Sequence, residues 1–228
     1  MKRQKAGSAT QTTTRVLRTA TADRTDVDPQ EEPRTMRKVV LYMMMTYDGY
    51  LANERDGLDW TVADPSMEGD DALTSDWDTA IVGYGGYKEM AAYWPTAKEA
   101  DPNISDSDAL FADKMNRMKK FVFSGSKHDL AWNNSELILI TDDASIIQAI
   151  TTIKKQPGKD IVVYGGVRIA QTLARLDLID EYLPVIHPVV IGRGKPLFEN
   201  IAQYLSLELV GVKQNDAGAV RIHYRRAR

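Results

Sequence analysis

The sequence contains no cysteine and only three histidines, His128, His187 and His223. Without cysteine the chain can form no disulfide, no thiolate zinc site and no iron–sulfur cluster, and it has no thiol nucleophile. No two histidines share the H-x-x-x-H spacing that places a pair of metal ligands on one face of a helix. The sequence therefore predicts a protein without a metal site.

The chain also lacks a strong excess of either charge. Its 29 Lys and Arg residues are balanced by 32 Asp and Glu residues, which gives a net charge of −3 over 228 residues. A dedicated nucleic-acid-binding protein needs a strongly basic face, so this balance argues against one. The longest apolar run, from Val39 to Met45, is far shorter than the roughly 20 residues of a membrane-spanning helix. We expect a globular protein of the cytoplasm that binds neither nucleic acid nor membrane.

The first 35 residues differ in composition from the rest. Residues 1 to 22 carry five basic side chains and no acidic one, and a charged stretch with Pro29 and Pro33 follows. Such a segment cannot bury enough apolar surface to offset the entropy lost on ordering it, and it lacks the apolar core of a secretory signal. We expect residues 1–35 to be a disordered tail or a non-native extension before a start at Met36, with an organelle transit peptide as the alternative. Residues 36–228 are expected to form one folded domain.

From Arg37 onward, short apolar runs alternate with helical patterns. The expected strands are Lys38–Met45, Thr79–Val82, Lys120–Phe123, Leu137–Ile140, Ile161–Tyr164, the extended stretch Glu181–Val190, and a hairpin of Leu205–Lys213 with Ala219–Arg225. The expected helices are a stretch that follows the glycine segment Gly83–Gly86 and runs to Tyr93, and the segments Ser107–Lys119, Ala144–Lys155 and Val167–Arg175. Pro95 is expected to end the first helix by pushing Trp94 out of the α region. The fold class is α/β, with three layers, a mixed and mostly parallel central sheet, and a C-terminal antiparallel hairpin.

Two segments, Thr79–Tyr87 and Asp160–Arg168, share the order of buried strand, glycine turn and helix start. In an open α/β sheet this arrangement directs backbone N–H groups and the positive end of the helix toward the crevice beyond the strands. Two such turns could hold the two ends of a dinucleotide, or they could be tight turns without a ligand. Neither is a G-x-G-x-x-G motif, because Lys88 stands where its third glycine would be.

The loop region after the first expected strand also contains side chains that could bind a ligand or transfer a proton. Thr46–Ala52 contains an Asp-Gly turn signal, and Gly57–Trp60 follows as a loop with a large aromatic side chain. Trp60 could contact a ligand or anchor the core. The loop carboxylates could donate protons if a cleft raises their pKa, or they could be solvated. These carboxylates are Asp48, Asp59 and Asp64.

Seven segments between Arg37 and Tyr224 resemble, in their order, the dihydrofolate reductase fold. They are Thr46–Ala52, Gly57–Trp60, Asp78–Gly83 with Tyr87–Met90, Lys120–Ser124, Val163–Arg168, Leu178–Glu181, and Pro188–Gly192 through Phe198. More specifically, the chain resembles the reductase domain at the C-terminal end of the bifunctional riboflavin-biosynthesis deaminase–reductase, and the stand-alone relatives of that domain. The deaminase domain with its zinc motif has no counterpart in this sequence.

The resemblance implies an NADPH-dependent reductase that transfers a hydride without metal or flavin. The implied substrate is a small pterin- or aminopyrimidine-type heterocycle similar to 5-amino-6-(5-phosphoribosylamino)uracil, and the implied assembly is a homodimer. The residues expected at the adenosine-phosphate half of the cofactor are Gly83, Tyr84, Gly85, Gly86 and Ser124. Those expected at its pyrophosphate are Gly165, Gly166, Val167 and Arg168. Those expected at the nicotinamide and substrate are Thr46, Asp48, Gly49 and Trp60, with Asp64 or Asp48 as the acid.

This sequence departs from the family pattern at one place. After Gly83 the family often has G-R-x-T-Y, whereas here Tyr84 and Gly86 replace the arginine and the threonine. An arginine fork on a phosphate is a strong, charge-assisted contact, so its loss leaves NADH as an alternative cofactor. A second hypothesis follows from the same change: a non-catalytic binding or interaction protein that keeps the fold without the cofactor site.

Overall fold

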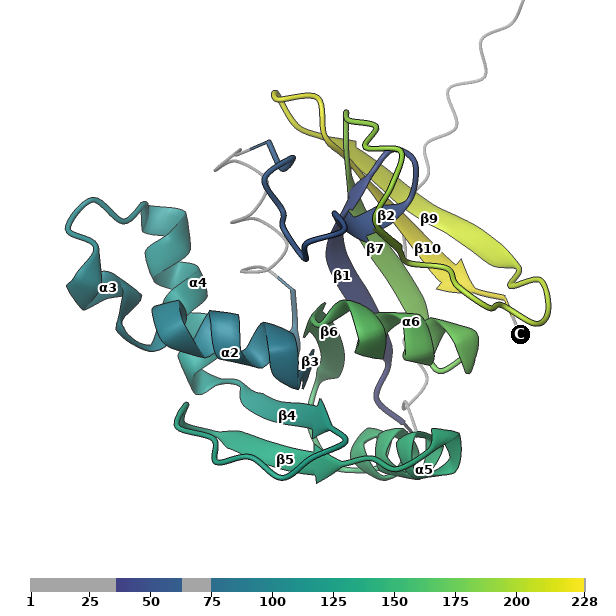
Figure 1. The fold of residues 1–228 in the computed structure, drawn as a ribbon, viewed down its shortest axis with the longest axis horizontal. Coiled ribbons are helices and arrows are strands. Elements are labelled where there is room, and N and C mark those ends of the chain that lie inside the picture. Colours follow the sequence, from purple (N-terminus) through teal and green to yellow (C-terminus); the bar gives the residue numbers. More distant parts are fainter. Residues whose placement is uncertain (1–35, 63–74, 228) are drawn as a thin grey trace, which may run out of the picture. The chain divides into compact units, whose positions relative to one another are not determined.

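The computed structural model describes residues 36–62 and 75–227. Its main feature is an eight-stranded sheet with the order β5-β4-β3-β6-β1-β7-β10-β9 (Figure 1). The strands of this sheet are β1 (Val39–Thr46), β3 (Trp77–Gly83), β4 (Lys119–Ser124), β5 (Ser135–Leu139), β6 (Asp160–Gly165), β7 (Glu181–His187), β9 (Leu207–Gln214) and β10 (Val220–Arg226).

The six strands from β5 to β7 are all paired in parallel, whereas β10 pairs antiparallel with both β7 and β9. The predicted mixed sheet with a C-terminal antiparallel hairpin is therefore confirmed. Strand β1 is central, as its apolar composition on both faces requires, because β6 and β7 flank it.

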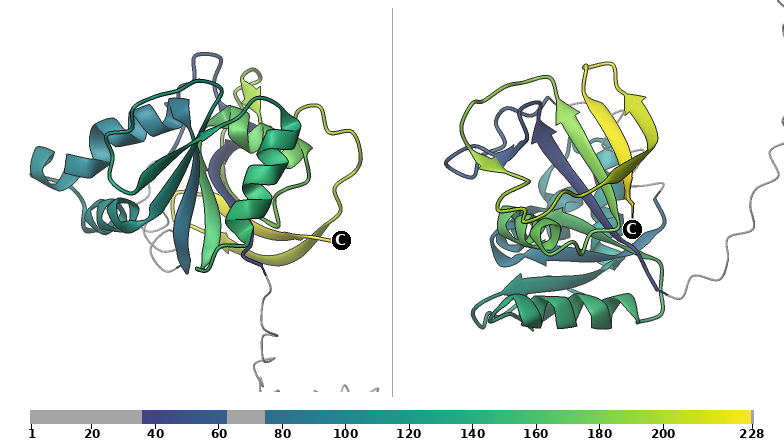
Figure 2. Two further views of the ribbon diagram at one scale, coloured as in Figure 1. Left: turned by 90° about the horizontal axis from the view of Figure 1, so that it is seen from below. Right: turned by 90° about the vertical axis from the view of Figure 1, so that its right-hand side faces the viewer.

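Helices cover both faces of the sheet, which makes the three predicted layers (Figure 2). They are α2 (Tyr84–Tyr93), η1 (Trp94–Thr96), α3 (Ala97–Ala100), α4 (Asp106–Arg117), α5 (Asp143–Lys154) and α6 (Val167–Arg175). Alternate residues of β1 divide between the layers: Val39 and Leu41 pack with α5 and α6, while Val40 and Tyr42 pack with α2 and α4. Two hydrophobic cores thus enclose the sheet.

The start of α5 follows from its sequence, because Asp142 and Ser145 form a reciprocal capping box. The end of α2 was only half predicted. The helix does end at Tyr93, but Trp94 keeps α-helical dihedrals (φ −61°, ψ −34°). The backbone departs from regular helix one residue earlier, at Tyr93 (φ −118°). Pro95 lies in the first turn of η1, where a helix does not need the N–H that proline lacks.

A second, two-stranded sheet was not predicted. In it β2 (Tyr50–Ala52) pairs antiparallel with β8 (Lys195–Pro196). Each strand is too short to show an alternating pattern in the sequence. The pairing fixes the loop after β1 against a segment more than 140 residues further along the chain.

Candidate functional site

The two glycine turns lie next to each other, because β3 and β6 are neighbouring parallel strands. Gly83 ends β3 and directly precedes α2, and Gly166 directly precedes α6 with a φ of +88° that favours glycine. Both segments therefore have the predicted strand–glycine–helix geometry, and both open at the same edge of the sheet.

The turns pack backbone against backbone. A Cβ atom on Gly86 would lie 2.8 Å from the Gly166 nitrogen, and one on Gly166 would lie 2.8 Å from the Gly83 Cα. Close packing of two turns therefore explains these glycines without any ligand. It does not explain Gly85, which has nothing within 4 Å of its Cβ position. At Gly85 the backbone is open to the approach of another group.

The helices that follow the glycines lack side-chain caps. Ser105 caps α4 and Asp142 caps α5, but no side chain accepts a hydrogen bond at the start of α2 or α6. The first N–H groups of a helix carry partial positive charge and favour an anion. Arg168, in the first turn of α6, is exposed and forms no side-chain ion pair with any described residue. This corner can therefore bind negatively charged groups such as phosphates.

Ser124, at the end of β4, lies beside the first turn of α2 through an aromatic pair that the sequence analysis missed. The rings of Tyr84 and His128 stack at 3.4 Å with an interplanar angle of 6°, and His128 Nε2 lies 3.0 Å from Ser124 Oγ. The Lys88 ammonium lies 5.8 Å from the centre of the Tyr84 ring. The arginine position of the family pattern is thus occupied by a stacked pair of rings with one lysine above it.

The turn after β1 is held by Asp48. Thr46 Oγ1 donates to the Asp48 carboxylate at 2.7 Å, and the Gly192 N–H donates to it at 2.8 Å. These bonds, with the one from Thr46 contributing most, lower the pKa of Asp48. A carboxylate with a lowered pKa stays ionised near neutral pH and is a poor proton donor. Gly49 completes the turn with a φ of +88°.

Trp60 lies against a histidine at the end of β7 that sequence reasoning did not assign. The Trp60 and His187 rings meet edge to face at 5.5 Å, and His187 is the neighbour of Thr46 across the β1–β7 ladder. The Val62 N–H donates to His187 Nδ1 at 3.0 Å, and His187 Nε2 lies 3.2 Å from the sulfur of Met44. Burial lowers the pKa of His187. Trp60 Nε1 is buried without a hydrogen-bond partner in the part of the chain that the structure describes.

All these groups lie along one edge of the sheet. Ser124, Gly83, Gly165, Thr46 and His187 end or immediately follow β4, β3, β6, β1 and β7, which are adjacent and parallel. The carboxyl edge of a parallel sheet is where open α/β folds bind ligands. Of the residues predicted for a site, Asp64 lies outside the described residues, so the structure gives it no position.

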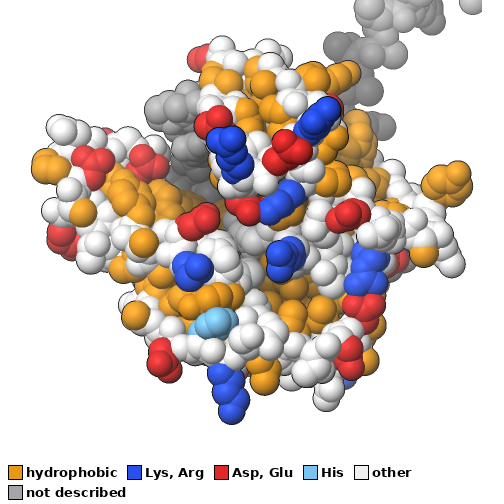
Figure 3. Space-filling view, viewed as in Figure 1, with side chains coloured by type: hydrophobic (Ala, Val, Ile, Leu, Met, Phe, Trp, Pro, Cys, Tyr) orange, Lys and Arg blue, Asp and Glu red, His pale blue; other side chains and the backbone are white. Residues whose placement is uncertain are grey.

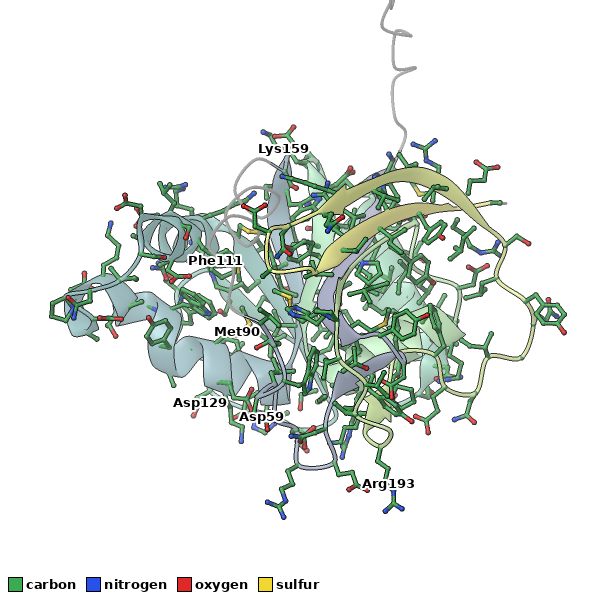
Figure 4. All side chains as sticks on the ribbon, turned by 90° about the horizontal axis from the view of Figure 1, so that it is seen from above. Asp59, Met90, Phe111, Asp129, Lys159 and Arg193 are labelled. Atoms are coloured by element: carbon green, nitrogen blue, oxygen red, sulfur yellow. The ribbon has the colours of Figure 1, made fainter. Side chains whose placement is uncertain are left out.

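The loop after β7 contributes little beyond its support of Asp48. Gly192 and Gly194 both have positive φ, and Lys195 forms an ion pair with Asp56. Arg193 extends outward from the tip of this loop (Figure 4).

Charged side chains of both signs are mixed across the face of the molecule in Figure 3, with hydrophobic side chains between them. In residues 36–62 and 75–227, no group of three or more His, Asp and Glu side chains is arranged to hold a metal ion. No helix in the same residues combines the length and the apolar composition that crossing a bilayer requires.

Comparison with known proteins places this arrangement in a family. Residues 37–220 match the family described as RibD C-terminal domain. The uncharacterized protein YyaP of Bacillus subtilis (strain 168) is 34% identical over 188 residues, which cover 82% of this chain and 94% of YyaP.

Solved structures share the fold at lower identity. A putative riboflavin biosynthesis protein from Shewanella sp. PV-4 is 22% identical with a TM-score of 0.60, and the match covers 84% of this chain and all of that one. Dihydrofolate reductase from Enterococcus faecalis, in complex with NADP(H), is 11% identical with a TM-score of 0.54, over 85% of this chain and 99% of the reductase. The predicted dihydrofolate reductase-like fold is confirmed.

Proposed function

This chain belongs to the RibD C-terminal domain family, and on that basis we propose that it is an NAD(P)H-dependent reductase of a small pterin- or aminopyrimidine-type heterocycle. The observation that carries the proposal is the pair of uncapped helix starts, α2 and α6, which adjoin each other at the ends of β3 and β6. Structural glycines alone would need neither uncapped N–H groups nor the open space at Gly85.

The residues at this corner suit a dinucleotide. The pyrophosphate would be held by the start of α6, through Gly165, Gly166, Val167 and the free guanidinium of Arg168. The adenosine-phosphate half would lie at Ser124 and the first turn of α2, which comprises Gly83, Tyr84, Gly85 and Gly86. A bound nicotinamide supplies the hydride, and the chain's own task is to hold it in line with the substrate and exclude water.

The substrate would lie at the ends of β1 and β7, bordered by Thr46, Asp48, Gly49 and Trp60. Asp48 would keep the β1–β2 turn in shape as an ionised carboxylate, because Thr46 and Gly192 donate to it. Asp64 is the acid proposed to protonate the reduced heterocycle. We further propose that residues 36–228 act as this reductase domain, in the cytoplasm and as a homodimer.

The cofactor proposed is NADPH, with NADH as the alternative. No arginine follows Gly83, and the ammonium of Lys88 lies over the Tyr84 ring. A single lysine attracts a phosphate as a point charge, without the two parallel hydrogen bonds of an arginine fork. The preference for NADPH over NADH should therefore be smaller than in relatives that keep the arginine.

Thermal unfolding of the full chain with NADPH, NADH or FMN tests the proposal. A ligand at 100 times its dissociation constant adds about 2.7 kcal/mol of stability. For a chain of this length that is a rise of about 5–10 °C in the melting temperature. The control is Arg168→Ala, which should melt like the wild type without ligand and shift less with NADPH.

A wild type that shifts with neither NADPH nor NADH contradicts the proposal. The result would favour the second function, a non-catalytic binding protein. The observation behind that alternative is the stacked Tyr84–His128 pair, which stands where the family pattern has a phosphate-binding arginine.

A further inference from the structure

The Trp60 loop, residues 53–62, is joined to the rest of the described protein by two polar contacts. One is an exposed ion pair between Asp56 and Lys195. The other is the hydrogen bond from the Val62 N–H to His187 Nδ1, which spans 125 residues of sequence. The loop's other hydrogen bonds are internal, such as the one from Asn53 Nδ2 to Asp59.

The hydrogen bond to His187 is the less exposed of the two: it is part-buried, and His187 itself is 2% exposed, whereas the Asp56 side chain is 60% exposed. Exposed ion pairs contribute little because water screens them and long side chains lose entropy in forming them. A part-buried N–H without its acceptor, in contrast, is left with some of its desolvation cost. The β2–β8 pairing holds the start of this loop, and the part-buried contact with His187 holds its Val62 end against β7.

His187 also sets the position of the indole. The Trp60 ring meets the imidazole edge to face at 5.5 Å, and Trp60 Nε1 has no hydrogen-bond partner among residues 36–62 and 75–227 that would hold the ring elsewhere. The imidazole is itself fixed from the strand side, because Nε2 lies 3.2 Å from Met44 Sδ. One histidine thus links β1, β7 and the loop.

We infer that His187 is a positioning residue of the proposed substrate site: its neutral imidazole, accepting from Val62 N–H, holds the Trp60 loop against the end of β7. The inference rests on the proposed function only in assigning Trp60 to the substrate. The loop's attachment is a property of the free protein.

The attachment depends on the proton at Nδ1. A neutral ring with its proton on Nε2 accepts the Val62 N–H, whereas a protonated ring carries N–H groups at both nitrogens and cannot. Burial lowers the pKa of His187, which keeps the ring neutral at physiological pH. The groups that touch it from β1 and the loop, Met44, Trp60 and Val62, do not ionise.

The charged side chains on the segments next to His187 are Glu54, Arg55, Asp56 and Asp59 in the Trp60 loop, Asp48 in the turn after β1, and Asp216 in the turn between β9 and β10. None of them contributes to the pKa shift, whose one cause is burial. Acidification should therefore release the loop with a midpoint below the ordinary histidine pKa of 6.5.

The test measures the loop in the full chain without cofactor. Amide hydrogen exchange reports the Val62 N–H, and fluorescence reports Trp60 after subtraction of the same protein carrying Trp60→Phe. In the wild type, lowering the pH from 8 to 5 should lower the protection of the Val62 N–H, measured against its intrinsic exchange rate at each pH, and shift the Trp60 emission to longer wavelength. Loss of one hydrogen bond corresponds to a fall of about 2- to 12-fold in this protection.

Two variants separate positioning from general stability. His187→Asn places an amide oxygen near the position of Nδ1 without a titratable group, so Val62 should stay protected at every pH. His187→Leu removes the acceptor and should release the loop at pH 8 as well. The matched control, Asp56→Asn, breaks the exposed ion pair and should leave both signals as in the wild type.

The inference is wrong if His187→Asn titrates as the wild type does, or if His187→Leu protects Val62 as well as the wild type does. A wild type without a pH response between 8 and 5 also contradicts it. Addition of NADPH at pH 8 tests the proposed function separately. If the loop responds to pH but NADPH produces no thermal shift, the reductase proposal fails and the role of His187 stands.

Discussion

Adjacent glycines in the first turn of α2 should respond in opposite directions to the same substitution. Gly85 and Gly86 both lie in a helix, where alanine reduces the entropy of the unfolded chain and stabilises by about 0.4–1 kcal/mol if it fits. Alanine fits at Gly85, whose Cβ position has nothing within 4 Å. Gly85→Ala should therefore raise the melting temperature by about 1–4 °C.

At Gly86 the same methyl group meets backbone. Its Cβ would lie 2.8 Å from the Gly166 nitrogen and 3.2 Å from the Gly165 carbonyl carbon. These atoms cannot move aside easily, because β6 is paired on both sides, with β3 and β1. Overpacking of this kind costs about 1–3 kcal/mol, which outweighs the entropic gain. We expect Gly86→Ala to lose about 1–2 kcal/mol, or about 2–8 °C in melting temperature.

Urea and thermal unfolding of the two variants, followed by circular dichroism, measure the difference. Because both substitutions add the same methyl group to the same helical turn, the propensity gain largely cancels in the comparison. A Gly86→Ala protein as stable as Gly85→Ala would refute the claim that the two turns are packed to contact. Under the proposed function, Gly85→Ala should also reduce the NADPH-induced shift without loss of stability, because its methyl group enters the open space.

Substitutions at three other residues test the energetics of the fold. Burial would raise the pKa of Glu181, but hydrogen bonds from His223 and Lys38 lower it to about 2. Because the carboxylate is protonated less readily in the folded protein than in the unfolded chain, the free energy of unfolding of the wild type should fall by about 3 kcal/mol as the pH drops from 4.5 to 2. Urea unfolding of Glu181→Gln should lack this fall. Burial lowers the pKa of Lys120 to about 8, and its ammonium donates to two carbonyls at the end of α4. Lys120→Met should lose about 1–3 kcal/mol at pH 7, and the deficit should widen as the pH rises above 8, because the wild type then gains stability and the variant does not. Asp142→Ala removes the N-cap of α5 and should cost about 1 kcal/mol in the same assay, while Asp142→Asn should recover most of it.

The fold was predictable because its signals are local. Strand β6, for example, shows a continuous apolar run that fits a strand buried on both faces, and α6 was predicted with its observed bounds. The predictions that were missed or wrong also have local causes. The three residues of β2 are too few for a period, and the dihedral angles of Trp94 were decided by the start of η1 rather than by Pro95 alone.

The glycine turns were predicted as motifs, but the reason for each glycine was not. Gly83 and Gly86 look alike in the sequence, as does Gly85 between them. The contact with Gly166 depends on β3 and β6 being neighbours, although 77 residues separate Gly83 from Asp160. Strand order is a property of the whole sheet, and no short window of sequence contains it.

The histidines mark the limit of sequence reasoning most clearly. His128 and His187 lie in no recognisable sequence motif. The role of each depends on a partner in another segment of the fold, which is Tyr84 for His128 and Val62 for His187. A buried, neutral imidazole that accepts a backbone N–H requires a particular strand register, here the pairing of His187 with Thr46. A shift of that register by one residue would turn the ring to the opposite face of the sheet, away from Met44 and the Trp60 loop. The same histidine would then have no role at the site, so its residue type alone could not have identified His187 as a site residue.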